Sequence, residues 1–130
     1  MLDLFIIKAG QSNSDVEKTL ESFSGSLFNC FIVDSVEEIN GIKKISDWYG
    51  VFYDNEIITD KLLVALPVFF SESHADVLTA YRTDDENLNI SSIMPRFFRK
   101  EIVLRDDCVN AIGDSLVYEK ILNGWILNNV

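Results

Sequence analysis

Histidine and cysteine are scarce in this 130-residue chain, which narrows the chemistry it can carry. His74 is the one histidine, so metal sites built from several imidazoles and histidine relays are excluded. The two cysteines, Cys30 and Cys108, lie far apart and lack the spacing of a metal motif. They indicate a reduced, cytoplasmic protein, although two cysteines also allow one disulfide. The absence of a Gly-x-Ser-x-Gly elbow and of a glycine-rich phosphate loop removes two further classes of site.

Basic residues are also few. Eleven Lys and Arg stand against 21 Asp and Glu, which gives a net charge of −10. That charge repels phosphate backbones and anionic lipids, so we expect neither a nucleic acid nor a membrane as partner. No uninterrupted apolar run approaches the roughly 20 residues that span a bilayer. Four basic residues nevertheless fall in the ten-residue window 96–105, which is the best place for side chains to bind an anion.

Apolar residues make up 48% of the chain and aromatic residues 12%, as in a folded globular protein. With no internal repeat, low-complexity tract or linker, the sequence predicts one domain over residues 1–130. The first eight residues hold an acid, Asp3, and only a short apolar run. They predict a first strand rather than a signal peptide.

Buried apolar runs alternate with amphipathic stretches along most of the chain. Residues 4–7, 30–33 and 49–53 have the continuous apolar pattern of strands buried on both faces. Helical patterns follow them at 14–25, 36–45 and 59–70, the last with Pro67 inside it. We expect another strand at 75–81, at least one more within 94–104, and a closing helix at 118–127. This order predicts an α/β fold, a single three-layer domain with a mainly parallel sheet.

Carboxylates follow two of these strands. Asp34 comes directly after the second strand, and Asp54 and Glu56 come directly after the third. In open α/β sheets ligands bind at the carboxyl ends of the strands, so we expect these three side chains to converge there. Asp54 and Glu56 would supply the oxygen ligands that Mg²⁺ or Mn²⁺ prefers. The alternatives are a solvated turn at Asp54 and a helix N-cap at Asp34, shared with Ser35.

Arg96 and Arg99 are candidates for binding phosphate through bidentate hydrogen bonds. In an extended strand their spacing of three puts them on opposite faces, so we expect one of them at the surface or in a salt bridge. Trp48, Tyr49 and Trp125 offer rings that stack on a base or sugar, although such aromatics more often lie in a core.

Three short segments resemble motifs of a known family. Residues 31–35 form a strand that ends in an acid and a serine, residues 48–60 hold the spaced acids, and residues 95–99 read Pro-Arg-Phe-Phe-Arg. In this order, over residues 3–105, the chain resembles the nucleotide-sugar-binding half of the family 2 glycosyltransferases. The resemblance implies an A-type (GT-A) Rossmann-like fold in which Asp34 contacts the nucleoside. It also implies that Asp54 and Glu56 bind a divalent metal, Mn²⁺ or Mg²⁺, with the sugar diphosphate.

The sequence departs from this family in several ways. Glu56 stands at the second acidic position, where its oxygens reach one methylene further than those of Asp. Asp106, Asp107 and Asp114 are candidates for the catalytic base, but none has the expected flanking residues. The chain is shorter than complete members, and short proteins of this kind resemble those of large tailed phages.

The sequence is therefore consistent with two functions, and it does not decide whether the protein is an enzyme. The first is a metal-dependent glycosyltransferase that takes a sugar from a nucleotide-diphosphate sugar to an unknown acceptor. The second is a catalytically inactive α/β domain that acts as an assembly or interaction protein with a protein partner, for example in a phage particle.

Overall fold

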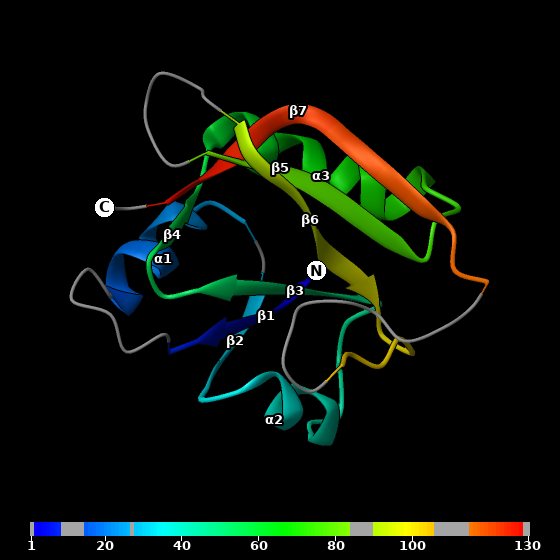
Figure 1. Cartoon of the computed structure of the whole chain (residues 1–130), viewed down its shortest axis with the longest axis horizontal. Coiled ribbons are helices and arrows are strands. Elements are labelled where there is room, and N and C mark those ends of the chain that lie inside the picture. The colour runs from blue at the N-terminus through cyan, green and yellow to red at the C-terminus, as the bar shows by residue number, and fades with distance from the viewer. Residues whose placement is uncertain (1, 9–14, 27, 84–89, 106–114, 129–130) are drawn as a thin grey trace.

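The computed structural model describes residues 2–8, 15–26, 28–83, 90–105 and 115–128 (Figure 1). Three helices lie among seven strands in this part of the chain. In chain order the elements are β1 (Leu2–Ile7), α1 (Val16–Ser22), β2 (Phe28–Val33), α2 (Val36–Gly41), β3 (Trp48–Tyr53), β4 (Glu56–Ile58), α3 (Asp60–Glu72), β5 (Val77–Thr83), β6 (Ile90–Arg99) and β7 (Tyr118–Asn128).

All seven strands belong to one mixed sheet with the order β2-β1-β3-β6-β5-β7-β4. β1 pairs in parallel with both β2 and β3, and β5 pairs in parallel with β7. β6 is antiparallel to β3 and β5, and the short β4 is antiparallel to β7. The sheet curls, so that the β1–β3 group and the β5–β7 group run in clearly different directions in Figure 1.

The core lies on both faces of this sheet, which explains why β1 is buried at every position. On one face, Leu62 and Leu66 of α3 pack with Leu4, Phe52 and other strand residues, and α1 adds partly buried side chains. On the other face, α2 packs against a second cluster built around Phe5, Tyr49 and Phe98. Burial on two faces explains the continuous apolar runs of these strands.

The predicted three-layer Rossmann-like α/β fold with a mainly parallel sheet is wrong. The three strands expected to be parallel are indeed parallel neighbours, as β2, β1 and β3. Beyond α3, however, the regular elements of the described residues are all strands, and half of the sheet pairings are antiparallel. The structure is therefore mostly β, a curled mixed sheet with short helices.

The expected closing helix at 118–127 is the strand β7. Its pairing with β5 shifts register: Ala80 lies opposite Ile121, but Arg82 lies opposite Ile126. The extra residues form a bulge, which breaks the two-residue alternation that marks a strand. Ile121 and Trp125 are then spaced like residues on one face of a helix, and this spacing misled the prediction.

Candidate functional site

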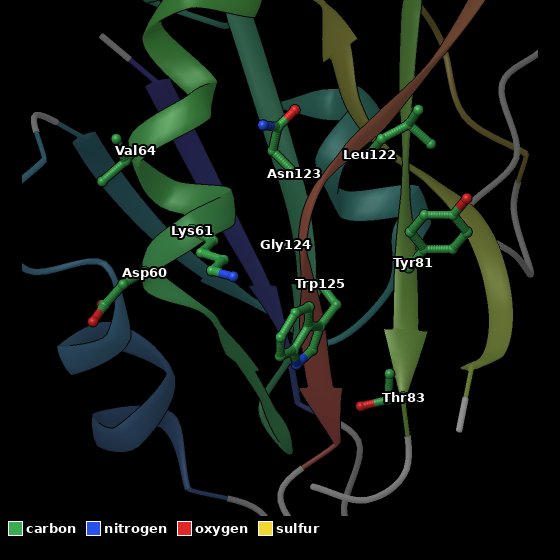
Figure 2. Close-up of a pocket in the computed structure, with 9 residues that line it drawn as sticks. All are labelled: Asp60, Lys61, Val64, Tyr81, Thr83, Leu122, Asn123, Gly124 and Trp125. Carbon is green, nitrogen blue, oxygen red and sulfur yellow. The ribbon is translucent and has the colours of Figure 1, made fainter. Parts of the chain in front are cut away.

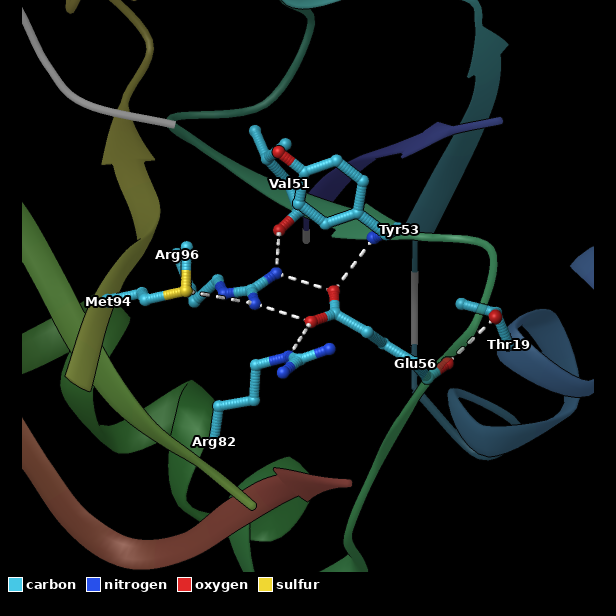
Figure 3. A network of polar contacts seen from close by, with 7 residues as sticks. All are labelled: Thr19, Val51, Tyr53, Glu56, Arg82, Met94 and Arg96. Atoms are coloured by element: carbon cyan, nitrogen blue, oxygen red, sulfur yellow. Dashed lines mark hydrogen bonds and ion pairs between the residues drawn. The ribbon is translucent and has the colours of Figure 1, made fainter. Parts of the chain in front are cut away.

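Glu56, the first residue of β4, is the more deeply buried of the two predicted metal ligands. A two-residue turn after Tyr53 redirects the chain and places the Glu56 side chain in the interior, where it is fully buried. Arg96 donates from Nη1 to Oε1 at 2.6 Å and from Nη2 to Oε2 at 2.5 Å. Arg82 donates from Nε to Oε2 at 2.7 Å, and the Tyr53 amide donates to Oε1 at 2.8 Å (Figure 3).

These contacts fix the charge state of Glu56. Burial alone would raise its pKa, but the Arg96 charge and the hydrogen bonds from Arg96, Tyr53 and Arg82 outweigh it. The pKa of Glu56 therefore lies below its ordinary value of 4.5. Arg96 is itself fully buried and also donates to the Val51 carbonyl at 3.1 Å. The ion pair thus joins β3, β4, β5 and β6 from inside the fold.

Asp34 and Asp54 lie at the same edge of the sheet, with β1 between them. Ile7 of β1 is in register with the last residues of both β2 and β3. The Asp54 residue is buried, and its backbone is tied down by Asp54 N–H donating to Ile7 O at 3.1 Å and Asp15 N–H donating to Asp54 O at 2.7 Å. The Asp34 side chain is 71% exposed and forms an ion pair with Lys8 at 3.2 Å. Ser35, rather than Asp34, accepts the capping hydrogen bond at the start of α2.

Arg99 points away from Arg96 and is held by the protein itself. Its Nε donates to the Ala75 carbonyl at 3.0 Å, and its Nη2 donates to the Ser73 carbonyl at 2.6 Å. Its guanidinium lies 4.2 Å from the ring centre of Trp48, which is 2% exposed. Arg96 is fully buried in an ion pair and Arg99 is half-buried, and the cation–π contact and carbonyl bonds give Arg99 a structural role.

The Glu56 environment does not fit a divalent metal. Both of its oxygens already accept hydrogen bonds, and two guanidinium groups stand where a cation would have to approach. Within the described residues, no cluster of three or more His, Cys, Asp or Glu side chains is placed to hold a metal. The candidate bases Asp106, Asp107 and Asp114 lie outside the described residues. Metal binding at Asp54 and Glu56 therefore stays a prediction without geometric support at Glu56.

A cavity of about 930 Å³ beside α3 escaped the sequence analysis. Its apolar walls come from Leu2, Trp48, Leu63, Leu66, Pro67 and Phe70, and Asp47 and Asp60 also line it. We call it the α3 groove. One signal for it was present in the sequence: the apolar residues of α3 include Val64 and Val68 as well as Leu62, Leu63, Leu66, Phe69 and Phe70. One face of the 13-residue helix α3 packs on the core, and its other apolar residues lie outside that face. They give the helix an apolar surface for a further contact.

A second hollow, of about 680 Å³, surrounds the β7 bulge. Figure 2 shows Lys61 and Val64 of α3 on one side of β7 and Tyr81 and Thr83 of β5 on the other. The bulge turns at Gly124, where φ is +80° and a Cβ would lie 2.3 Å from the Leu62 amide nitrogen. Only glycine fits there.

Comparison with known protein families and with characterised proteins found no match. In the described part of the chain, no helix is long and apolar enough to cross a membrane.

Proposed function

We propose that this chain is a non-catalytic interaction domain that binds an apolar, basic peptide segment of a partner protein in the α3 groove. One observation carries the proposal. Glu56, Arg96 and Arg99 were predicted to bind a ligand, but internal hydrogen bonds and ion pairs already occupy these side chains. The α3 groove, the larger of the two hollows described above, has apolar walls instead. The ligand-binding surface is therefore the groove rather than the acidic strand ends.

Apolar surface continues from the groove over the outer face of α3. Val64 is 76% exposed and Val68 is 56% exposed, and Val64 also lines the groove. Exposed apolar side chains next to an apolar hollow are typical of protein-interaction sites. An amphipathic helix or short apolar segment fills such grooves with side chains spaced along one face. The groove volume of about 930 Å³ accommodates several such side chains.

Charge selects the kind of segment. Asp47, whose side chain is 84% exposed, and Asp60 line the groove, and the whole chain carries a net charge of −10. Lys100 lies 3.6 Å from Asp47 as its exposed ion-pair partner. An anionic ligand such as a fatty acid would be repelled, while lysine or arginine beside apolar anchors would be attracted. A basic amphipathic segment fits both the walls and the rim.

The direct test uses two synthetic helical peptides, identical in their leucine face, with lysine on the polar face of one and glutamate on the polar face of the other. Fluorescence anisotropy should show the lysine peptide binding at least about tenfold more tightly, a difference of about 1.4 kcal/mol. Val64→Gln should weaken that binding, whereas Ile45→Gln, at a residue that is 69% exposed and does not line the groove, should not. Equal binding of both peptides, or equal effects of the two substitutions, would contradict the proposal.

The glycosyltransferase function is a second proposal, supported by one observation. β1, β2 and β3 are parallel, and Asp34 and Asp54 follow β2 and β3 at one sheet edge. Isothermal titration with nucleoside diphosphates and Mn²⁺ separates the two proposals. The interaction domain should give no metal-dependent binding. Binding that needs Mn²⁺ and is lost in Asp54→Asn would favour the transferase instead.

A further inference from the structure

β2 is an edge strand with an unusual composition for that position. It stands at one end of the sheet order, and β1 is its only neighbour among the strands of the described residues. Residues 28–33 contain no Asp, Glu, Lys, Arg or Pro, which are the residues that usually protect a strand edge from pairing. Ile32 is 50% exposed, and Cys30 is exposed too. The edge is therefore apolar, uncharged and open to another strand.

The backbone of β2 shows which residues face outward. The Lys8 amide donates to the Val33 carbonyl at 3.0 Å, so the Val33 carbonyl points toward the β1 side. Because successive residues of a strand point their N–H and C=O groups to opposite sides, Asn29 and Phe31 share this direction. The N–H and C=O groups of Phe28, Cys30 and Ile32 then point away from β1, toward the free edge.

We infer that two copies of this chain associate through antiparallel pairing of β2 with β2, centred on Cys30. A two-fold axis perpendicular to the sheet relates two antiparallel strands and keeps each face of the sheet on the same side. Paired residues then point to the same face, so one residue lies opposite its own copy, with the axis midway between the two. Centring on Cys30 places it opposite its own copy and places Phe28 opposite Ile32. These outward-facing residues exchange two backbone hydrogen bonds in each pair.

The side chains and charges of this register favour a second copy over an unrelated strand. Phe28 and Ile32 form two apolar cross-strand pairs, which is the kind of pair that stabilises antiparallel strands. Asp34 falls opposite the uncharged Ser26 of the copy, so no like charges oppose one another directly. An acidic chain of net charge −10 meets its own copy with least repulsion at an uncharged edge such as this. Added salt screens the remaining repulsion and should strengthen the dimer.

The first experiment uses a Cys108→Ser protein, in which Cys30 is the one remaining thiol. Directly opposed residues in a hydrogen-bonded antiparallel pair have Cβ atoms about 5.5 Å apart, beyond the roughly 3.5–4.5 Å of a disulfide, so a short bismaleimide reagent is used to span the two thiols. Each thiol adds across one maleimide double bond, so the reagent should give a covalently linked dimer. Sedimentation without the reagent should show a reversible dimer whose fraction rises with salt. A protein that stays monomeric at high concentration and high salt would overturn the inference.

A pair of matched variants separates edge pairing from other association. Ile32→Lys places a charge on the β2 edge, and Ile45→Lys places one at a residue that is 69% exposed and outside β2. Ile32→Lys should weaken dimerisation at least about tenfold, whereas Ile45→Lys should leave it within about twofold, and circular dichroism should show both folded. Equal dimerisation of the two variants, or a dimer without the Cys30 cross-link, would overturn it as well. Loss of dimerisation leaves the lysine-peptide binding of the α3 groove unchanged, so the two proposals fail separately.

Discussion

Glu56 and Asp34 have similar places in the sequence and opposite places in the structure. Each is a carboxylate that follows a parallel strand, and each forms an ion pair. The Glu56 side chain is fully buried between two arginines, whereas the Asp34 side chain is 71% exposed and reaches only a lysine whose own side chain is 53% exposed. An acid at a strand end therefore says little about its role until its burial is known.

The path of the chain after each strand produces this difference. After β3 a two-residue turn leads directly into β4, and its first side chain, Glu56, enters the interior. After β2 the chain leaves through Ser35 into α2, so Asp34 stays outside. Buried charges must be neutralised, and exposed ones need no partner. Removing one partner of the ion pair should therefore cost much stability at Glu56 and little at Asp34.

The largest effect is expected from Arg96→Met. It removes the bidentate partner of the buried Glu56 carboxylate and leaves Arg82 at Oε2, and breaking a buried ion pair in this way costs about 3–5 kcal/mol of unfolding free energy. Chemical denaturation monitored by circular dichroism measures this loss. Lys100→Met, which removes an exposed ion-pair partner, is the control and should change stability by less than about 0.5 kcal/mol. A similar small loss for both would mean that Glu56 is not buried with Arg96.

Acid should produce the next largest effect, because it acts on two buried carboxylates at once. For Asp3, burial alone would raise the pKa, but hydrogen bonds from Asn29, Ile45 and Ser46 outweigh it and leave it below the ordinary 3.8. The pKa of Glu56 likewise lies below 4.5. A lowered folded-state pKa gives stability that is present above the unfolded value and lost as pH falls through the folded one. Unfolding free energy should therefore fall below about pH 4.5, and Glu56→Gln should flatten that slope.

Asp3→Asn sharpens the comparison with a buried carboxylate whose hydrogen bonds from the described residues come from uncharged groups. Asp3 accepts from the Asn29 amide at 3.0 Å and from the Ile45 and Ser46 backbone amides at 2.6 and 3.1 Å. In place of one carboxylate oxygen, Asn has an NH2 group, which would face an N–H donor and leave it without an acceptor. We expect this to lower the unfolding free energy by about 1–3 kcal/mol. Thermal and chemical unfolding measure the loss. Unchanged stability would show that these amides bond elsewhere.

The smallest effect is expected from Asp34→Asn. Its ion pair with Lys8 is exposed, and such pairs contribute about 0–1 kcal/mol. We expect a change within about 0.5 kcal/mol in the same denaturation assay. A loss as large as that of Arg96→Met would mean that exposure does not separate the two acids.

The sequence predicted the first half of the molecule better than the second. The runs in β1, β2 and β3 are continuous and apolar because these strands are buried on both faces, so they could be found and grouped. β7 could not be found, because its bulge gives Ile121 and Trp125 a helical spacing. The arginine partners of Glu56 lie 26 and 40 residues further along the chain, and no local pattern indicates such a pairing.

The most direct test of the buried role of Glu56 is a double-mutant cycle with Glu56→Gln and Arg96→Met. If the two side chains neutralise each other in the interior, removing both leaves no unpaired buried charge. The double variant should then be more stable than Arg96→Met alone, with a coupling energy of about 0.5–3 kcal/mol in denaturant unfolding. If the losses of the two single variants simply add, the carboxylate and guanidinium do not interact, and Glu56 would again be free to bind a ligand.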